Sequence, residues 1–247
     1  MHTTPGEVHV HKTMLREIAF DYEYDSNGSA KKPSSFLKDL RGLESIKTSS
    51  IYPRGAVLFA EGQRPRGVYI LCEGRAKISV ASAEGKTLVL KIAGPGDVLG
   101  LNSALTENAA LATAETIDRC RIDFVSREDF VSLLEGDRKS YLDIARALSQ
   151  ELSGLMDHTR LLLLSDSAAE KLAKLLLNWS DVEGKRTPQG TQIVCGLTHA
   201  ELAQLICTSR ETVTRILGDF QRAGTLVLTG GVITVRNRRA LELLVRN

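Results

Sequence analysis

Cysteine is scarce in this chain of 247 residues, and its four copies are scattered. No two of them form a CxxC pair and none lies in a cluster with histidine, so the sequence predicts neither a zinc site nor a disulfide framework. We interpret Cys72, Cys120, Cys195 and Cys207 as reduced thiols that are mostly buried. The histidines near the N-terminus have no Cys or carboxylate partners at fixed spacing, so we predict no metal ligand.

Long apolar runs are also missing. No run approaches the roughly 20 residues that span a bilayer, and the N-terminus lacks the apolar stretch of a signal peptide. We therefore expect no membrane partner and a cytoplasmic location.

The 32 basic and 30 acidic side chains give a formal net charge of only +2, which excludes a histone-like polycation. Any nucleic-acid footprint must be local.

The sequence motifs of catalysis are absent too. GxGxxG, the Walker loop and HExxH do not occur, and no nucleophile with a partnered base is visible. We therefore expect no catalytic residues and interpret the protein as something other than an enzyme.

The first part of the chain reads as an extension followed by an all-β domain. Residues 1–35 are polar and rich in turn formers, which predicts a disordered or loosely ordered extension. Short alternating apolar bursts then predict strands at residues 57–59, 68–71, 76–80, 88–92 and 121–125. Corner glycines punctuate them, namely Gly55, Gly62, Gly74, Gly85, Gly96 and Gly100. We predict a sensor-type β-roll over residues 36–137.

A change of period after the roll predicts one long helix over residues 138–164. Apolar and small residues follow one another at steps of four and three, as in the seam of a coiled coil: Tyr141, Ala145, Leu148, Leu152, Leu155, Thr159 and Leu162. We expect a dimer interface that includes Leu148, Leu152, Leu155 and Leu162. A helix that packs on its own roll would show a similar stripe, and this alternative stays open.

A polar break at residues 165–167 opens a second domain, predicted over residues 165–247. Its serines favour the N-cap of a helix from Ala168 to Trp179. The stretch Glu183–Gly190 reads as flexible, and a strand is expected at residues 192–194. Two short helices and a hairpin complete the expected order of elements.

The two short helices form a helix-turn-helix pattern. Thr198 with Glu201 makes a capping box for the first helix, and Thr208 with Glu211 makes a second box after a break at Cys207. The outward face of the second helix then carries side chains that suit the major groove: Ser209, Arg210, Glu211, Thr214 and Arg215. Arginine fits guanine, glutamate fits cytosine, and hydroxyl groups fit phosphates. We predict a DNA-binding site at these residues together with Thr198 and Thr208.

The alternative for this helix is an ordinary solvated face with neighbouring ion pairs. The downstream sequence argues against it, because residues 225–235 read as a hairpin with a Thr229-Gly230-Gly231 turn, the wing expected beside a recognition helix. Arg236, Arg238 and Arg239 follow and add positive charge.

The segment Leu197–Arg215 resembles the helix-turn-helix signature of the cyclic-AMP receptor and fumarate-nitrate reduction regulator (CRP/FNR) family almost position by position. The glycines of the roll and Gly96-Asp97 also fall in family order, and the resemblance covers about residues 36–247. It implies an α+β fold with an N-terminal cyclic-nucleotide-binding-like β-roll, a long dimerisation helix and a C-terminal winged helix-turn-helix.

The resemblance also implies a function, namely transcription regulation by a homodimer on double-stranded DNA with a palindromic operator. The arrangement of Arg210, Glu211 and Arg215 resembles the cyclic-AMP receptor branch, which predicts TGTGA-like half-sites. Contact with RNA polymerase is a further implication of the family. Activation and repression both stay open.

The resemblance does not identify an effector for this protein. The cyclic-AMP branch holds the phosphate with a Glu shortly after the Gly-Asp motif and an Arg-Ser pair before the next strand, and residues 96–112 have neither. A buried phosphodiester would lack a cation there. We assign no role to Glu107, and the iron-sulfur branch's N-terminal cysteine cluster is absent. The cofactor is therefore unknown, haem has no obvious ligand, and constitutive DNA binding stays open.

A rival hypothesis is a nucleotide-binding module whose helical tail contacts another protein. Such a contact favours aromatic and apolar side chains, whereas Arg210, Thr214 and Arg215 are polar or cationic. This composition favours DNA.

Overall fold

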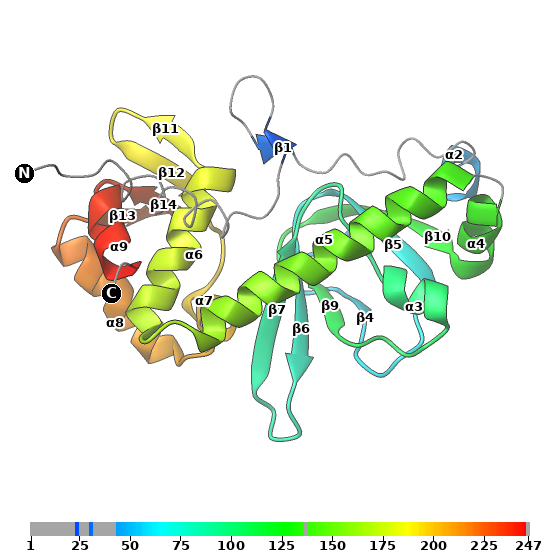
Figure 1. Cartoon of the computed structure of the whole chain (residues 1–247), viewed down its shortest axis with the longest axis horizontal. Coiled ribbons are helices and arrows are strands. Elements are labelled where there is room, and N and C mark those ends of the chain that lie inside the picture. The colour runs from blue at the N-terminus through cyan, green and yellow to red at the C-terminus, as the bar shows by residue number, and fades with distance from the viewer. Residues whose placement is uncertain (1–22, 25–29, 32–42, 136–137, 246–247) are drawn as a thin grey trace, which may run out of the picture. The chain divides into compact units, whose positions relative to one another are not determined.

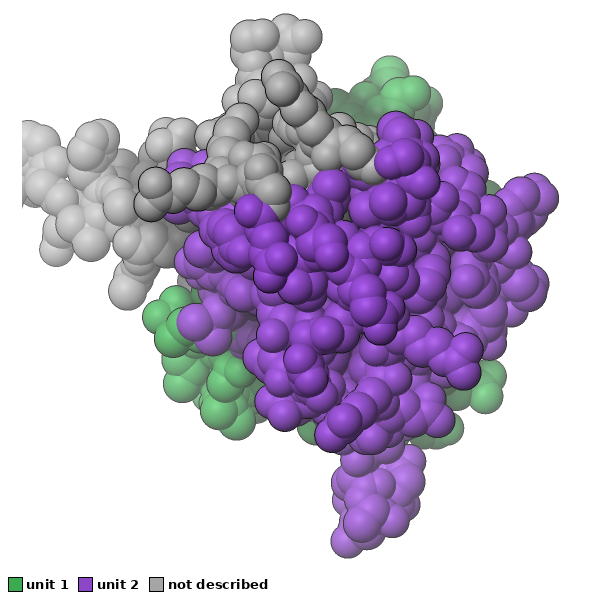
Figure 2. Space-filling view, turned by 90° about the vertical axis from the view of Figure 1, so that its right-hand side faces the viewer, with its two compact units in different colours: residues 1–31, 156–247 green, residues 32–155 purple. Residues whose placement is uncertain are grey.

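A computed structural model describes residues 23–24, 30–31, 43–135 and 138–245 of the chain. The chain divides into two compact units, residues 32–155 and residues 1–31 with 156–247, which Figure 2 shows in different colours. The extension predicted over residues 1–35 lies outside the described residues, except for the short antiparallel strands β1 (Glu23–Tyr24) and β2 (Ala30–Lys31). In the part of the chain that the structure describes, no helix has the length and apolarity to cross a membrane.

The first unit is a β-roll of two four-stranded antiparallel sheets (Figure 1). One sheet has the order β3 (Thr48–Tyr52), β10 (Cys120–Ser126), β5 (Gly67–Glu73), β8 (Val98–Leu99). The other has the order β4 (Val57–Phe59), β9 (Thr113–Thr116), β6 (Ala76–Ala81), β7 (Thr87–Ala93). All five predicted strands are present, and β3, β8 and β9 are additional.

The side chains of β5 show how the roll is filled. Leu71 belongs to a buried cluster with residues from both sheets, whereas Val68 and Ile70 point to a second cluster. Alternation along a strand sends neighbours to opposite faces, so one strand serves both cores. Four helices cover or extend the second cluster: α2 (Leu43–Ile46), α3 (Leu101–Thr106), α4 (Arg127–Glu135) and α5 (Arg138–Leu163).

The six predicted corner glycines all have positive φ, between 79° and 99°. Gly74 shows why one of them must be glycine, because a Cβ there would lie 2.6 Å from the carbonyl oxygen of Arg119. Both the backbone conformation and the space exclude a larger residue. The prediction of turns at these glycines is confirmed.

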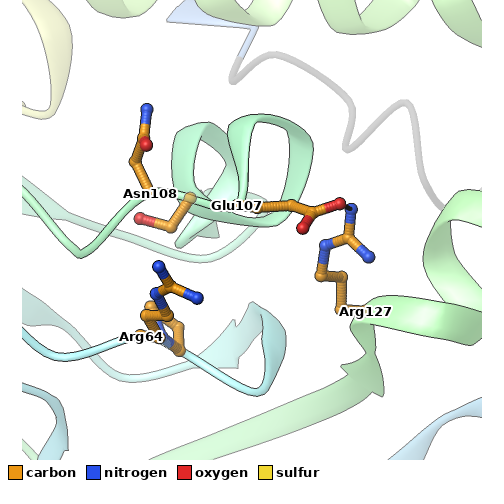
Figure 3. A pocket seen from close by; sticks show the side chains of 6 residues that line it. Arg64, Glu107, Asn108 and Arg127 are labelled. Atoms are coloured by element: carbon orange, nitrogen blue, oxygen red, sulfur yellow. Dashed lines mark hydrogen bonds and ion pairs between the residues drawn. The ribbon is translucent and has the colours of Figure 1, made fainter.

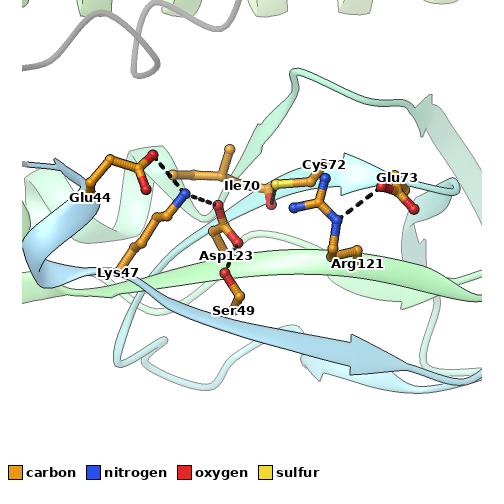
Figure 4. Close-up of polar contacts among 8 residues, drawn as sticks. All are labelled: Glu44, Lys47, Ser49, Ile70, Cys72, Glu73, Arg121 and Asp123. Atoms are coloured by element: carbon orange, nitrogen blue, oxygen red, sulfur yellow. Dashed lines mark hydrogen bonds and ion pairs between the residues drawn. The ribbon is translucent and has the colours of Figure 1, made fainter.

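A polar network crosses the first sheet beside these cores (Figure 4). Asp123 is only 4% exposed, and its carboxylate accepts from Ser49 at 2.5 Å and pairs with Lys47 at 2.9 Å. Burial opposes ionisation, but hydrogen bonds from Ser49, Lys47 and Cys72 outweigh it and hold the pKa of Asp123 below its usual value. Burial, together with Asp123, raises the pKa of the Cys72 thiol, so this cysteine stays protonated.

The residues of the predicted seam on the long helix α5 differ in how exposed they are. Leu148 is half-buried against the core of its own roll, which is the alternative stated for this stripe. Leu152 and Leu155 are 60% and 38% exposed, and Met156 is 54% exposed. Exposed apolar side chains lie both on the predicted seam, at Tyr141, Ala145, Leu152 and Leu155, and one residue after it, at Leu142, Met156 and Leu163. Leu162 is half-buried.

The second unit contains the last turns of α5, the helix α6 (Ala168–Val182) and a four-stranded sheet. Ser167 is the N-cap of α6, as predicted for this polar break, and its hydroxyl accepts from the Glu170 N–H at 3.1 Å. His158 of α5 donates through Nε2 to the carbonyl of Leu205 at 2.8 Å, which ties α5 to the helices that follow.

The prediction of a flexible stretch over Glu183–Gly190 was wrong. This segment forms strand β11 (Lys185–Thr187), which pairs with β12 (Gly190–Val194) in an antiparallel hairpin. Gly190 permits the tight turn because its φ is +131° and a Cβ would lie 2.3 Å from the carbonyl oxygen of Val235. The sheet continues with β14 (Val232–Val235) and β13 (Leu226–Thr229), and helix α9 (Arg238–Val245) packs on α6.

Candidate nucleic-acid interface

The first helix of the predicted pair, α7 (His199–Leu205), begins at a complete capping box. The hydroxyl of Thr198 accepts from the Glu201 N–H at 3.1 Å, and the Glu201 carboxylate accepts from the Thr198 N–H at 2.7 Å. Each partner satisfies an N–H group that the helix leaves without an internal acceptor. The prediction from the spacing of these two residues is confirmed.

The second helix, α8 (Arg210–Arg222), begins one residue later than predicted. Its N-cap is Ser209, whose hydroxyl accepts from the Thr212 N–H at 3.1 Å. Thr208 instead belongs to the turn, where its N–H donates to the carbonyl of Ala203 at 2.9 Å. The capping box predicted for Thr208 and Glu211 was therefore wrong. Cys207, which lies in this turn, adopts a left-handed conformation, with φ 53°.

Apolar side chains lock the two helices together. Leu202 and Leu205 of α7 and Val213, Ile216 and Leu217 of α8 are all at most 5% exposed. Because these residues recur at helical spacing, burying them fixes which face of α8 points outward.

The outward face of α8 carries four of the five predicted side chains, and the fifth, Ser209, is the N-cap of the helix. Arg210, Glu211, Thr214 and Arg215 are all exposed. Arg215 contacts only Asp219 of the same helix, at 3.4 Å, and Arg210 makes no ion pair with another described residue. Hydrogen bonds from its own N–H and from Ser209 hold the pKa of Glu211 below its usual value, so this side chain is an anionic acceptor. The face offers two guanidinium forks and one carboxylate.

His199 is a functional candidate that sequence reasoning missed. Its Nδ1 lies 2.8 Å from the hydroxyl oxygen of Thr214, and that hydroxyl donates to the carbonyl of Arg210 at 2.9 Å. Because the single hydroxyl proton is already donated, Nδ1 must carry the proton of the contact with His199. This bridge positions Thr214, and its only sequence signal is that His199 follows the N-cap of α7.

The wing beside α8 is a tight hairpin without cations at its tip. Gly230 and Gly231 have φ values of 55° and 82°, as a two-residue turn between β13 and β14 requires. All three arginines that follow are exposed, but Arg238 also binds Asp181 through two nitrogens at 2.5 and 2.9 Å. Arg238 therefore holds α9 against α6, and the positive charge that it was predicted to add is paired with a carboxylate.

The roll contains the Gly-Asp motif, which has a structural role. Asp97 accepts from the Gly94 N–H at 2.7 Å and from Lys91 at 2.9 Å, so its carboxylate closes the turn before β8. In the cyclic-AMP branch, an arginine lies near the end of the loop that follows. In this chain Leu111 lies near the end of that loop, and it is 73% exposed.

Among the described residues, no group of three His, Cys, Asp or Glu side chains is arranged to hold a metal. Cys120 and Cys195 are buried, and Cys207 is exposed.

Two family models match the chain, one in each unit. Residues 50–137 match the cyclic nucleotide-binding domain, and residues 170–244 match the Crp-like helix-turn-helix domain. The first match covers the β-roll, and the second covers α7, α8 and the wing.

Curated relatives share this arrangement over most of their length. The CRP-like cAMP-activated global transcriptional regulator of Mycobacterium tuberculosis is 28% identical over 79% of this chain and 87% of its own. The fumarate and nitrate reduction regulatory protein of Escherichia coli is 27% identical over 77% and 76%. FixK2 from Bradyrhizobium japonicum has the same fold, with a TM-score of 0.71, 22% identity and coverage of 81% and 97%. The chain belongs to the CRP/FNR family, whose members are DNA-binding transcription regulators and not enzymes.

Proposed function

We propose that a homodimer of this protein places its two α8 helices in successive major grooves of a palindromic operator with TGTGA-like half-sites. The observation that carries the proposal is the exposed face of α8, where Arg210 and Arg215 form no ion pair with a described residue outside their own helix. A guanidinium fork fits the O6 and N7 atoms of guanine, and the Glu211 carboxylate fits the amino group of cytosine.

The hydroxyl groups of the site contribute in another way. Those of Thr198 and Ser209 are used as helix caps, and that of Thr214 is held between Arg210 and His199. In the proposed complex, Thr198, Thr208, Ser209 and Thr214 line the phosphate backbone and set the register of the helix, while the charged side chains read bases. The N–H groups at the start of both helices favour a phosphate oxygen.

The dimer forms through the exposed line of α5. Leu152 and Leu155 from the predicted seam, with Met156, give an apolar strip that a second copy of the same helix covers. Leu162 contributes at the edge, and Leu148 supports the strip from the roll side. Dimerisation sets the distance between the two recognition helices, so it determines operator affinity.

We propose that cyclic AMP does not control this protein in the manner of its cyclic-AMP-activated relatives. Residues 96–112 form strand β8, helix α3 and a loop that contain no arginine or lysine. A buried cyclic phosphate needs a cation to offset its desolvation. The effector is a different signal, or DNA binding is constitutive. Contact with RNA polymerase at the promoter, in the cytoplasm, completes the proposal.

A DNA titration tests these statements together. Purified protein is added to a palindromic TGTGA-type duplex and to a scrambled duplex at matched salt, with and without cyclic AMP, because phosphate contacts make affinity strongly salt-dependent. We expect tight binding to the palindrome alone, unchanged by cyclic AMP. Equal affinity for both duplexes would reject the operator, and activation by cyclic AMP would reject the statement on the effector.

A further inference from the structure

A cavity of about 130 Å³ lies in the roll, outside the helix-turn-helix (Figure 3). Three segments that are far apart in the sequence meet there: the loop before β5, the end of α3 and the first residue of α4. The lining residues are Arg64, Pro65, Ser103, Glu107, Asn108 and Arg127.

The two arginines of this cavity have hydrogen-bonding capacity to spare. Arg127 contacts Glu107 through one terminal nitrogen at 2.5 Å, but its Nε is buried and has no hydrogen-bond partner in the described structure. Arg64 is exposed and makes no hydrogen bond or ion pair with any residue that the structure describes. A buried N–H without an acceptor is costly in a folded protein, so Arg127 has a hydrogen-bond donor that is not satisfied.

The charges favour an anion. Two guanidinium groups stand against the single carboxylate of Glu107, which leaves the cavity with a net positive charge. Arginine forks match the oxygens of a phosphate in geometry as well as in charge. A volume of about 130 Å³ holds several water molecules and therefore a phosphate group. Ser103, which is 6% exposed, lines the same space.

We propose that this cavity binds the phosphate group of a small phosphorylated molecule. Arg64 and Arg127 are its ligands, and Glu107 is the internal anion with which the phosphate competes. Neither arginine lies within residues 96–112, where the resemblance places the cyclic-nucleotide phosphate marks that this sequence lacks, although Ser103, Glu107 and Asn108 of the lining do. The proposal does not depend on the proposed operator, because binding is measured without DNA.

Isothermal titration of the full-length protein tests the proposal, at constant ionic strength so that screening is equal throughout. The probes are inorganic phosphate, phenyl phosphate as a phosphate monoester, and acetate as a carboxylate. We expect saturable binding of both phosphates, and tighter binding of the monoester if its organic group also fills the cavity. Acetate binding as tight as that of phosphate, or no saturable binding of phosphate, would overturn the assignment.

Variants separate a ligand site from a structural ion pair. Arg64→Gln and Arg127→Gln should each weaken phosphate binding about tenfold, as the loss of one charge-assisted hydrogen bond predicts. Arg66→Gln is the matched control, because Arg66 is also exposed and lies two residues away but does not line the cavity. Equal affinities of the Arg64 and Arg66 variants would reject the site.

Glu107→Gln gives the sharpest result because its expected effect has the opposite sign. Removing the competing carboxylate should tighten phosphate binding severalfold, whereas a merely damaged loop would weaken it. Circular dichroism confirms that each variant is folded. Unchanged or weaker phosphate binding by folded Glu107→Gln protein would contradict the role given to this residue.

Discussion

The two units of this protein differ in how their functional surfaces arise from the sequence. In the C-terminal unit, the candidate DNA-reading residues come from one continuous stretch, Thr198–Arg215, and lie on two adjoining helices. In the roll, the cavity is assembled from Arg64, the end of α3 and Arg127, which only the fold brings together. The candidate DNA-reading surface can therefore be predicted from the sequence, and the cavity cannot.

The first way to break this comparison is to separate two protomers. Leu152→Asp should weaken dimerisation by roughly 3–6 kcal/mol, because the substitution occurs in both protomers and burial of one leucine is worth about 1.5–3 kcal/mol. Sedimentation at micromolar concentration measures the effect. Ser153→Asp, on the next exposed position, is the control. A Leu152→Asp protein that stays dimeric would show that this part of α5 is not the interface.

The second test asks whether the two units unfold independently. Phe130 is fully buried in the roll, and Phe130→Ala should destabilise it by about 3–5 kcal/mol through lost contacts and a cavity. Trp179, the sole tryptophan of the chain, lies in α6 and reports on the C-terminal unit alone. We expect urea unfolding measured by circular dichroism to shift to lower urea concentration. The unfolding transition measured by the fluorescence of Trp179 should stay in place.

Leu111→Ala is the control for this test, because Leu111 is 73% exposed and its loss should leave both transitions unchanged. If Phe130→Ala moved the two transitions together, the units would unfold as one cooperative structure, and the comparison between them would lose its energetic basis.

The third test concerns the DNA-reading face. Arg210→Ala should cost about 1–3 kcal/mol on the matched operator and relax preference at a single base pair, as expected for a lost bidentate contact. Arg222→Ala, at the other end of α8, is the control and should change affinity little. Competition titrations with single-base variants of the half-site measure the difference. A uniform loss on all sequences would assign Arg210 to the phosphate backbone instead.

Local signals predicted the fold and much of the candidate interface. The capping box of Thr198 depends only on spacing along one helix, and the corner glycines depend only on their own backbone conformation. Thr208 was placed wrongly because the next residue, Ser209, is the N-cap, and N-cap propensity alone does not decide between two neighbouring hydroxyl residues. The hairpin of β11 was missed because its pairing with β12 compensates for a polar, turn-rich sequence.

Long-range contacts explain what stayed hidden. The ion pair of Arg238 could not be predicted because Asp181, its partner, is distant in the sequence. Leu148 of the predicted seam packs against its own roll, and a periodic stripe does not say which neighbour covers it. Arg64 and Arg127 carry no sequence pattern at all. Prediction from sequence therefore ends where function depends on segments that meet only in the folded chain.

The smallest expected effect tests the roll through its own long-range contact, the pairing of Asp123 with Lys47 and Ser49 (Figure 4). Because the folded pKa of Asp123 is lowered, its ionised form stabilises the fold above the ordinary pKa of about 3.9, and this contribution is lost as pH falls through the folded value. Asp123→Asn should therefore cost roughly 1 kcal/mol at neutral pH, the size of an ordinary hydrogen bond. The difference in free energy of unfolding between this variant and the wild type should shrink in acid.

Asp166→Asn is the control, because Asp166 is exposed and its carboxylate makes no ion pair with a described residue. Urea unfolding between neutral and acid pH measures both variants, and a difference that did not depend on pH would place the role of Asp123 in packing rather than in charge.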